Sequence, residues 1–372
     1  MKKNYTFLII LALLLAFTNC KKEESLKNNV TGAAQSFSDN ITSELQNIYN
    51  QLPNTSYGII KLVHGDILQF QSKEHYAQVY ETLLDRYDTW SMLFFESYSK
   101  CTNEELECKV ASTNFDERMP LFEFEKQCGI ENHNLRALRD KEEEMWKNLG
   151  QPGDPPPFDS LIICPVEQTL FSEFYEVCIG DTICQIRSNG YQILIPLSSQ
   201  QYIGQVRSAT TPQVISHAGD WGVIVLSPKS GTCYEKKWKI EQPIDRYNGY
   251  KFIWSYHFWN NWFSGTRATV VMKNFKWKNN EWKKDYAVCA LGSSSEIYID
   301  ISTAWGSCLG GGFYGKNPKN PNKAYTRTVV TQIVFMDTDP KLFRVNPANS
   351  EVKCRSYGED YVFNVETGQR KN

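Results

Sequence analysis

The spacing of apolar residues changes once along this chain, and that change most constrains its fold. Between residues 76 and 87 they recur at i, i+3, i+4, i+7, i+8 and i+11, the pattern of an amphipathic helix. Residues 90–95 predict another helix. Beyond a proline-rich stretch at 152–157, apolar residues alternate with a period of two, as in strands. The sequence therefore predicts an α+β fold, with a small helical N-terminal region followed by a mostly antiparallel β domain, a sandwich or an open barrel.

Two predicted hairpins fix which residues face each other. A Gly180-Asp181 turn places residue 177 opposite 184 and 178 opposite 183, so Cys178 and Cys184 lie on opposite faces. An Asn279-Asn280 turn pairs Trp277 with Trp282. The same register pairs Phe275 with Lys284, Lys273 with Tyr286 and Val271 with Val288.

The N-terminus predicts export. Lys2 and Lys3 precede an apolar run at 7–17, which is too short to span a bilayer and is typical of a signal peptide. Cys20 follows at the position where a bacterial lipoprotein signal carries its lipidated cysteine. Residue 22 is not an Asp, the signal for retention in the inner membrane, so sorting to the outer membrane is favoured. The predicted organisation is a signal peptide (1–19), a lipidated flexible tether (20–40), an acidic, mainly helical region ending in a Pro-rich linker (41–158) and a basic, aromatic-rich β domain (159–372).

Charge divides between the two halves of the chain. Residues 40–185 hold 11 Lys and Arg against 25 Asp and Glu, whereas residues 186–372 hold 24 against 14. The two parts are therefore expected to attract each other or to address different partners. Within the acidic part, the helix after Asn134 carries charges at 140–144, which predict a solvent-exposed face.

Ten cysteines remain after Cys20, and an even number in an exported protein favours disulfides. Cys101 and Cys108 are the best local candidates, because the polar residues between them predict a loop that folds back. Neither Cys nor His spacing indicates a metal site. The glycine-rich segment 306–312 matches no phosphate or nucleophile motif and predicts a bulged β-loop with Cys308 in a disulfide.

The order of a helix with a Tyr and Trp stripe, a proline-bearing linker and the hairpin 179–183 resembles a group of uncharacterised Bacteroidetes surface lipoproteins. The stretch 254–282, with an aromatic strand, a Thr/Val strand and a Lys-rich turn before Trp, is similar to their C-terminal parts. The resemblance implies an exported, membrane-anchored protein and no particular chemistry.

Aromatic and basic residues of the β domain are the candidate ligand-binding set. Aromatic side chains interleaved with lysines suit stacking on sugar rings or capture of acidic glycans. The set is Trp254, Tyr256, Lys276, Trp277, Trp282 and Lys284.

The predicted function is a non-enzymatic binding or interaction module of the cell envelope, held at the outer membrane by its lipid. The partner is a glycan or an envelope protein; no catalytic residue, cofactor or nucleic acid is expected. The alternatives are a secreted hydrolase that uses Asp/Glu or Ser/His groups and a structural component of an envelope complex.

Overall fold

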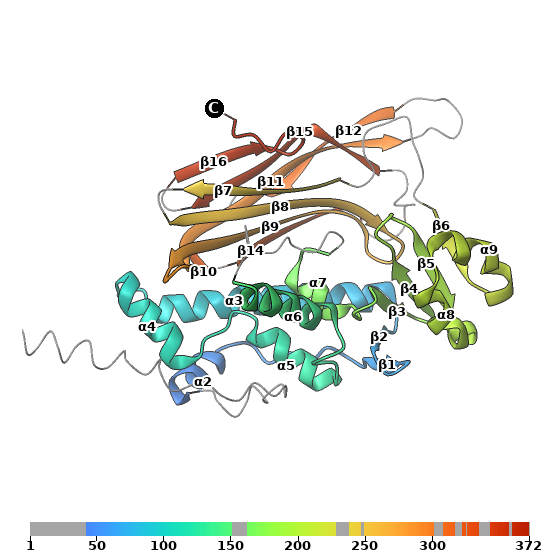
Figure 1. Ribbon diagram of the computed structural model, residues 1–372, viewed down its shortest axis with the longest axis horizontal. Helices are drawn as coiled ribbons and strands as arrows, with labels where there is room; N and C mark the ends of the chain where they lie inside the picture. Colours follow the sequence, from blue (N-terminus) through green and yellow to red (C-terminus); the bar gives the residue numbers. More distant parts are fainter. Residues whose placement is uncertain are drawn as a thin grey trace, which may run out of the picture.

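The computed structural model describes residues 42–150, 162–227, 238–246, 249–300, 308–316, 322–324, 326–334, 343–356 and 359–371. These residues form an α+β fold with N-terminal helices and three mostly antiparallel sheets, none of which closes into a barrel. Figure 1 shows two sheets stacked above a layer of helices, with the third sheet at one end of that layer. The predicted fold class is confirmed.

The helical layer follows the local signals of the sequence. Ser72 caps the long helix, and its hydroxyl accepts a hydrogen bond from the His75 amide. No Gly or Pro interrupts this helix, so it continues through residues 90–95, which the sequence assigned to a separate helix. The helices are α2 (Ser43–Tyr49), α3 (Lys73–Ser97), α4 (Asn103–Thr113), α5 (Met119–Cys128), α6 (Leu135–Asn148) and α7 (Pro165–Leu170).

The six-stranded sheet joins segments from both sides of the prolines. Its order is β1 (Lys61–Val63), β2 (Ile67–Phe70), β3 (Glu176–Ile179), β4 (Thr182–Ile186), β5 (Gln192–Pro196) and β6 (Ile224–Leu226). β2 pairs with β3 in parallel, and the core beneath them contains Leu68 and Val177. The boundary that the sequence predicts at 158 therefore lies between two strands of one sheet, and the strands of the other two sheets all follow β6.

Both faces of this sheet are covered. Cys184 faces α3, whereas Cys178 faces the side covered by α8 (Ile203–Ser208) and α9 (Thr211–Trp221), beyond the 3₁₀ helix η2 (Leu197–Tyr202). The pairs Val177–Cys184 and Cys178–Ile183 confirm the predicted register. Gly180 has φ 58°, a left-handed conformation that glycine adopts without strain.

Two five-stranded sheets form a sandwich. One has the order β10-β9-β8-β7 with β14 also on β9, and the other has the order β12-β11-β15-β16 with β13 also on β11. The strands are β7 (Trp238–Arg246), β8 (Tyr250–Asn261), β9 (Gly265–Lys278), β10 (Glu281–Lys284), β11 (Ala287–Asp300), β12 (Cys308–Lys316), β13 (Asn322–Ala324), β14 (Thr326–Val334), β15 (Phe343–Ser356) and β16 (Glu359–Asn364).

The core of the sandwich comes from alternate residues of facing strands. Phe252 and Trp254 from β8 pack against Tyr361 and Phe363 from β16. In β12 the pairing shifts between Ile297–Gly312 and Tyr298–Gly310, which confirms the predicted bulge in the glycine-rich segment.

The hairpin after Asn279 is shorter than predicted. Phe275–Lys284 is the last pair between β9 and β10, and the chain then crosses to the other sheet as β11. Lys273 pairs with Thr326 and Val271 with Thr328, both in β14, so the predicted pairs with Tyr286 and Val288 are wrong. β14 takes the place beside β9 that the longer hairpin would have filled.

The outer face of the β8–β9 sheet packs on the helical layer. Ile163, next to α7, contacts a cluster of Ile253, Val271 and Phe275. Beside it, Arg267 of β9 forms a buried ion pair with Glu167 of α7. The acidic and basic parts of the chain therefore meet inside the molecule. This agrees with the expectation that the two parts attract each other.

The segment between Cys101 and Cys108 is helical, because Thr102 and Glu105 form a capping box that starts α4. A helix rises about 1.5 Å per residue, so this segment does not fold back as the predicted loop would. Within the described ranges the structure contains no disulfide bond. The Cys101–Cys108 disulfide therefore stays a prediction that α4 does not favour.

Candidate functional site

The β9–β10 hairpin ends in the predicted two-residue turn. Asn279 and Asn280 have φ values of 58° and 62°, and asparagine tolerates this left-handed conformation better than most residues. A turn with two positive φ values has a twist that matches that of the flanking strands. Trp277 and Trp282 are direct cross-strand partners, as predicted, with ring centroids 5.2 Å apart in an edge-to-face arrangement. The tip of this hairpin is the candidate site.

The two indoles have different environments. The side chain of Trp277 is 46% exposed, and it lies opposite Gly249, which has no side chain to cover it. Trp282 is half-buried against the cluster that joins the sheet to the helices. The Lys251 ammonium lies 3.9 Å from the centroid of the Trp282 ring, and Lys251 is itself buried. Trp277 is thus available to a ligand, whereas Trp282 holds a buried cation.

Two lysines of the tip bind a carboxylate of the helical layer. Glu107 of α4 forms ion pairs with Lys276 and with Lys278, the latter at 3.1 Å. Burial alone would raise the pKa of Glu107, but the two ammonium groups more than offset it and hold the pKa below its ordinary value. Lys276 also lies 3.8 Å from an Asp285 oxygen. The lysines are therefore already engaged by the protein itself.

Lys284 belongs to the interface between sheet and helices. Its charge helps to lower the pKa of Asp116 and of Glu143, in both cases against the effect of burial. Lys284 is half-buried at the base of the short hairpin. Its partner is Phe275, so Lys284 lies on the same face of the hairpin as Trp277 and Trp282 and on the face opposite Lys276.

Trp254 and Tyr256 lie in the sandwich core with no exposed surface. Trp254 stacks on Phe363, and the Tyr256 hydroxyl lies 2.7 Å from the Ser295 hydroxyl. These two residues pack the sheets together instead of forming part of an exposed face. The alternation of side chains along the strand correctly placed Trp254 and Tyr256 on one face of β8. It does not show which face of the strand packs against another sheet.

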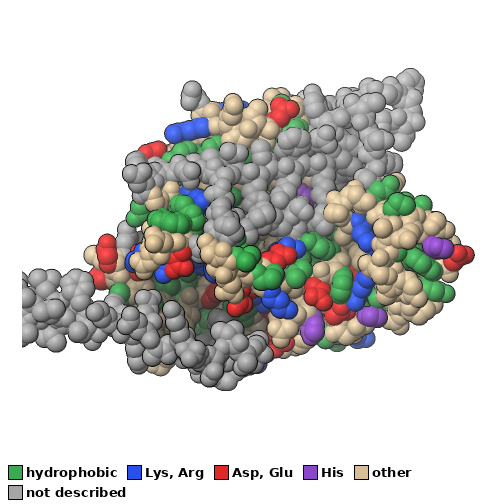
Figure 2. Space-filling view, viewed as in Figure 1, with side chains coloured by type: hydrophobic (Ala, Val, Ile, Leu, Met, Phe, Trp, Pro, Cys, Tyr) green, Lys and Arg blue, Asp and Glu red, His purple; other side chains and the backbone are tan. Residues whose placement is uncertain are grey.

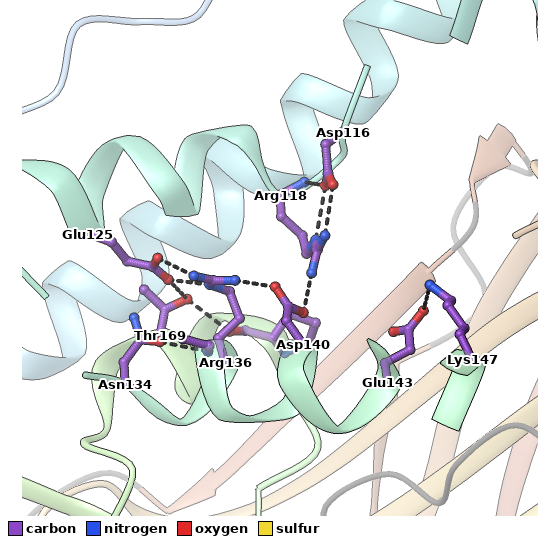
Figure 3. A network of polar contacts seen from close by, with 11 residues as sticks. Asp116, Arg118, Glu125, Asn134, Arg136, Asp140, Glu143, Lys147 and Thr169 are labelled. Carbon is purple, nitrogen blue, oxygen red and sulfur yellow. Dashed lines mark hydrogen bonds and ion pairs between the residues drawn. The ribbon is translucent and has the colours of Figure 1, made fainter. Parts of the chain in front are cut away.

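The sequence missed a network of buried charges between α5, α6 and α7 (Figure 3). Arg136 binds both oxygens of Glu125, at 2.5 and 2.6 Å, and Thr169 donates to the same carboxylate at 3.1 Å. Asp140 joins this pair to Arg118 by accepting from both guanidinium groups at 2.5 Å.

The network continues at both ends. Arg118 binds both oxygens of Asp116, at 3.0 and 2.8 Å. Glu143 binds Lys147 at 2.8 Å, one turn along α6. Figure 2 shows acidic and basic side chains interleaved over the helical layer. Of the predicted solvent-exposed face at 140–144, Lys141 and Glu144 are exposed, whereas Asp140 and Glu143 are half-buried, and Asp140 also binds Arg118, which lies outside its own helix.

The network fits a structural role. Three of its carboxylates, those of Asp116, Glu125 and Asp140, are bound by arginines, which are always charged and do not exchange protons in proteins. Burial raises the pKa of Glu125, while Arg136 and Thr169 act against this shift. Each charge is thereby held by a fixed opposite charge, an arrangement that locks α5 to α6 and α7.

Within the described ranges, no three His, Cys, Asp or Glu side chains come close enough to hold a metal ion. No helix of those ranges is long and apolar enough to cross a membrane. The predicted lipidation site, Cys20, lies outside the described residues.

Comparisons with known proteins give little. No family model matches the chain, and no curated protein matches it. Among solved structures, the chain is similar to a DUF4848 family protein from Bacteroides thetaiotaomicron, with 9% identity over 81% of this chain and 95% of that one, at a TM-score of 0.16. So low a score carries no argument about fold or activity. The resemblance to Bacteroidetes surface lipoproteins therefore stays a prediction.

Proposed function

We propose that this chain is an exported, non-enzymatic binding module of the cell envelope, anchored to the outer membrane by a lipid on Cys20, and that its hairpin tip binds a glycan. The N-terminal sequence supports the anchor, because a short apolar run ends directly before Cys20. The sequence predicts a flexible tether over residues 20–40 between this lipid and the folded part of the chain.

The observation that carries the proposal is the exposure of Trp277 at the end of a sheet. Aromatic side chains of this domain are mostly packed in cores, so an indole that is 46% exposed is unusual in its surroundings. An indole offers a large, rigid apolar face with a polar edge, which suits the apolar face of a sugar ring. The Asn279-Asn280 turn and the partner strand fix its position.

The glycan proposal is tested with the full chain in detergent on immobilised neutral and acidic polysaccharides. Trp277→Ala should lose most of the retention while keeping its melting temperature within a few degrees. Met145→Ala, which truncates an exposed apolar side chain on α6, is the matched control and should retain binding. Absence of retention on every polysaccharide, or equal retention by Trp277→Ala, would contradict the proposal.

The anchor is tested by fractionating cells that express the wild type or Cys20→Ala. The wild type should partition into the outer membrane with the mass of a lipidated mature chain, whereas the variant should be soluble after export or remain an unprocessed precursor. Identical partitioning and mass for both proteins would show that Cys20 carries no lipid.

A further inference from the structure

We propose that Lys276 and Lys278 form a subsite for the carboxylates of an acidic glycan, a uronic acid polymer, and that Glu107 occupies this subsite when no ligand is bound. This inference rests on the proposed glycan-binding function and adds to it a class of ligand and an internal competitor.

The geometry of the pair supports a carboxylate ligand. Lys276 and Lys278 are two residues apart on β9, so their side chains leave the same face of the strand. One oxygen of Glu107 contacts Lys276 and the other contacts Lys278, the latter at 3.1 Å. A single carboxylate thus bridges both ammonium groups. Because Glu107 comes from α4 and the lysines from β9, the lysine pair already holds a carboxylate that belongs to another part of the fold.

Exposure makes this internal carboxylate replaceable. The side chains of Glu107 and Lys278 are 42% and 54% exposed, and ion pairs at such positions contribute little because water screens them. Lys276 is more enclosed and also lies near Asp285, so its ammonium is held in place. The carboxylate of a ligand therefore displaces only the weak contact of Glu107, and it binds a Lys276 ammonium that is already held in position.

The neighbouring side chains favour a polymer of acidic sugars over a free anion. Trp277 lies between the two lysines in sequence, so its indole leaves the opposite face of β9 and the two groups flank the exposed end of the hairpin. The nearby Lys283 is paired with Glu281 at 2.9 Å, so that pair adds no net charge. A uronic acid chain that passes around this end presents the ring of one unit to the indole and the carboxylate of another to the lysines, and repeated units raise its effective concentration at the tip.

The test compares polygalacturonate with its methyl ester, which has the same backbone without the charge. The full chain in detergent is titrated with each polymer, for the wild type, Glu107→Gln, Lys278→Gln and Glu81→Gln. Glu107→Gln should bind polygalacturonate about two- to fivefold more tightly, because the competitor is gone. Lys278→Gln should bind more weakly. Glu81→Gln, which removes an exposed carboxylate from α3, is the control for net charge and should match the wild type.

A double variant separates direct competition from a general charge effect. If Glu107 acts by occupying the lysine pair, its replacement should gain less in the Lys278→Gln background than in the wild type. The inference is overturned if Glu107→Gln and Glu81→Gln gain equally, or if neither gains. Equal binding of the acidic polymer and its ester, lost in Trp277→Ala, would overturn the inference and leave the proposed function standing. Failure of all variants on every polysaccharide would overturn both.

Discussion

Two carboxylates of the helical layer each bind cations from another element, and their surroundings give them different roles. Glu125 is fully buried, and Arg136, which is 7% exposed, binds both of its oxygens (Figure 3). Glu107 bridges Lys276 and Lys278 near the surface, where water reaches Glu107 and Lys278. The first pair locks helices together, whereas the second is an exposed contact that a ligand is able to replace.

The difference follows from the dielectric environment rather than from the number of contacts. In the interior, an ion left without its partner pays a large desolvation penalty, so the pair acts as a unit. At the surface, water replaces the missing partner and the cost is small. The same residue types therefore hold the fold in one place and are available for recognition in another.

The largest expected effect is the loss of the buried pair. Arg136→Met leaves the Glu125 carboxylate buried without its guanidinium and should destabilise the protein by about 3–5 kcal/mol. Glu107→Gln should change stability by less than about 1 kcal/mol, because the carboxylate is exposed. Urea unfolding of the two variants beside the wild type measures both changes.

The double variant Glu125→Gln/Arg136→Met is the control for this comparison. Removing both charges should recover part of the stability that the single Arg136→Met variant loses, because no unpaired ion remains. If Arg136→Met cost no more than Glu107→Gln, burial would not distinguish the two sites as we infer.

An intermediate effect is expected at the tip, where the two indoles should differ. Trp282→Ala removes the ring that the buried Lys251 ammonium faces and should cost about 2 kcal/mol. Trp277→Ala should cost less than about 1 kcal/mol, since nearly half of its surface is already in water. Trp282→Phe keeps an aromatic face and should retain part of the lost stability. Equal melting temperatures of the two alanine variants would show that Trp282 does not support Lys251.

The smallest effect concerns pH. Burial alone would raise the pKa of Glu143, but Lys284 and Lys147 hold it at about 2. Because this pKa lies below the unfolded value of about 4.3, the ionised carboxylate stabilises the fold above that value, and this contribution is lost as the pH falls toward 2.

Glu143→Gln should therefore be less stable than the wild type at pH 7, by about 1 kcal/mol because the side chain is partly exposed. The two unfolding free energies should converge near pH 2, as measured in urea from pH 2 to 7. A constant difference across that range would mean that Glu143 does not titrate as proposed.

Local rules predicted the parts of the fold that depend on neighbouring residues. The Gly180 and Asn279-Asn280 turns and the opposite faces of Cys178 and Cys184 all follow from signals within a few positions. The pairing of Trp277 with Trp282 follows from the turn in the same way.

Long-range pairing was beyond those rules. Nothing in the sequence near β9 indicates that β14, more than forty residues later, takes its edge, or that β2 pairs with β3 across the helices. Alternation placed Trp254 among aromatic residues of one face, but burial of that face depends on β16. The charges of 140–144 lie in a polar run, yet Asp140 binds two arginines because α5 packs beside α6.

The sequence by itself predicted an export signal with Cys20, and it determined the α+β class and the strand pairing next to the Gly180-Asp181 and Asn279-Asn280 turns, because that pairing depends on a short stretch of chain. Only the tertiary structure decided which charges are buried pairs, which lysines meet Glu107 and which indole is exposed. These outcomes depend on elements that approach one another from distant parts of the chain, and on the water that their packing excludes.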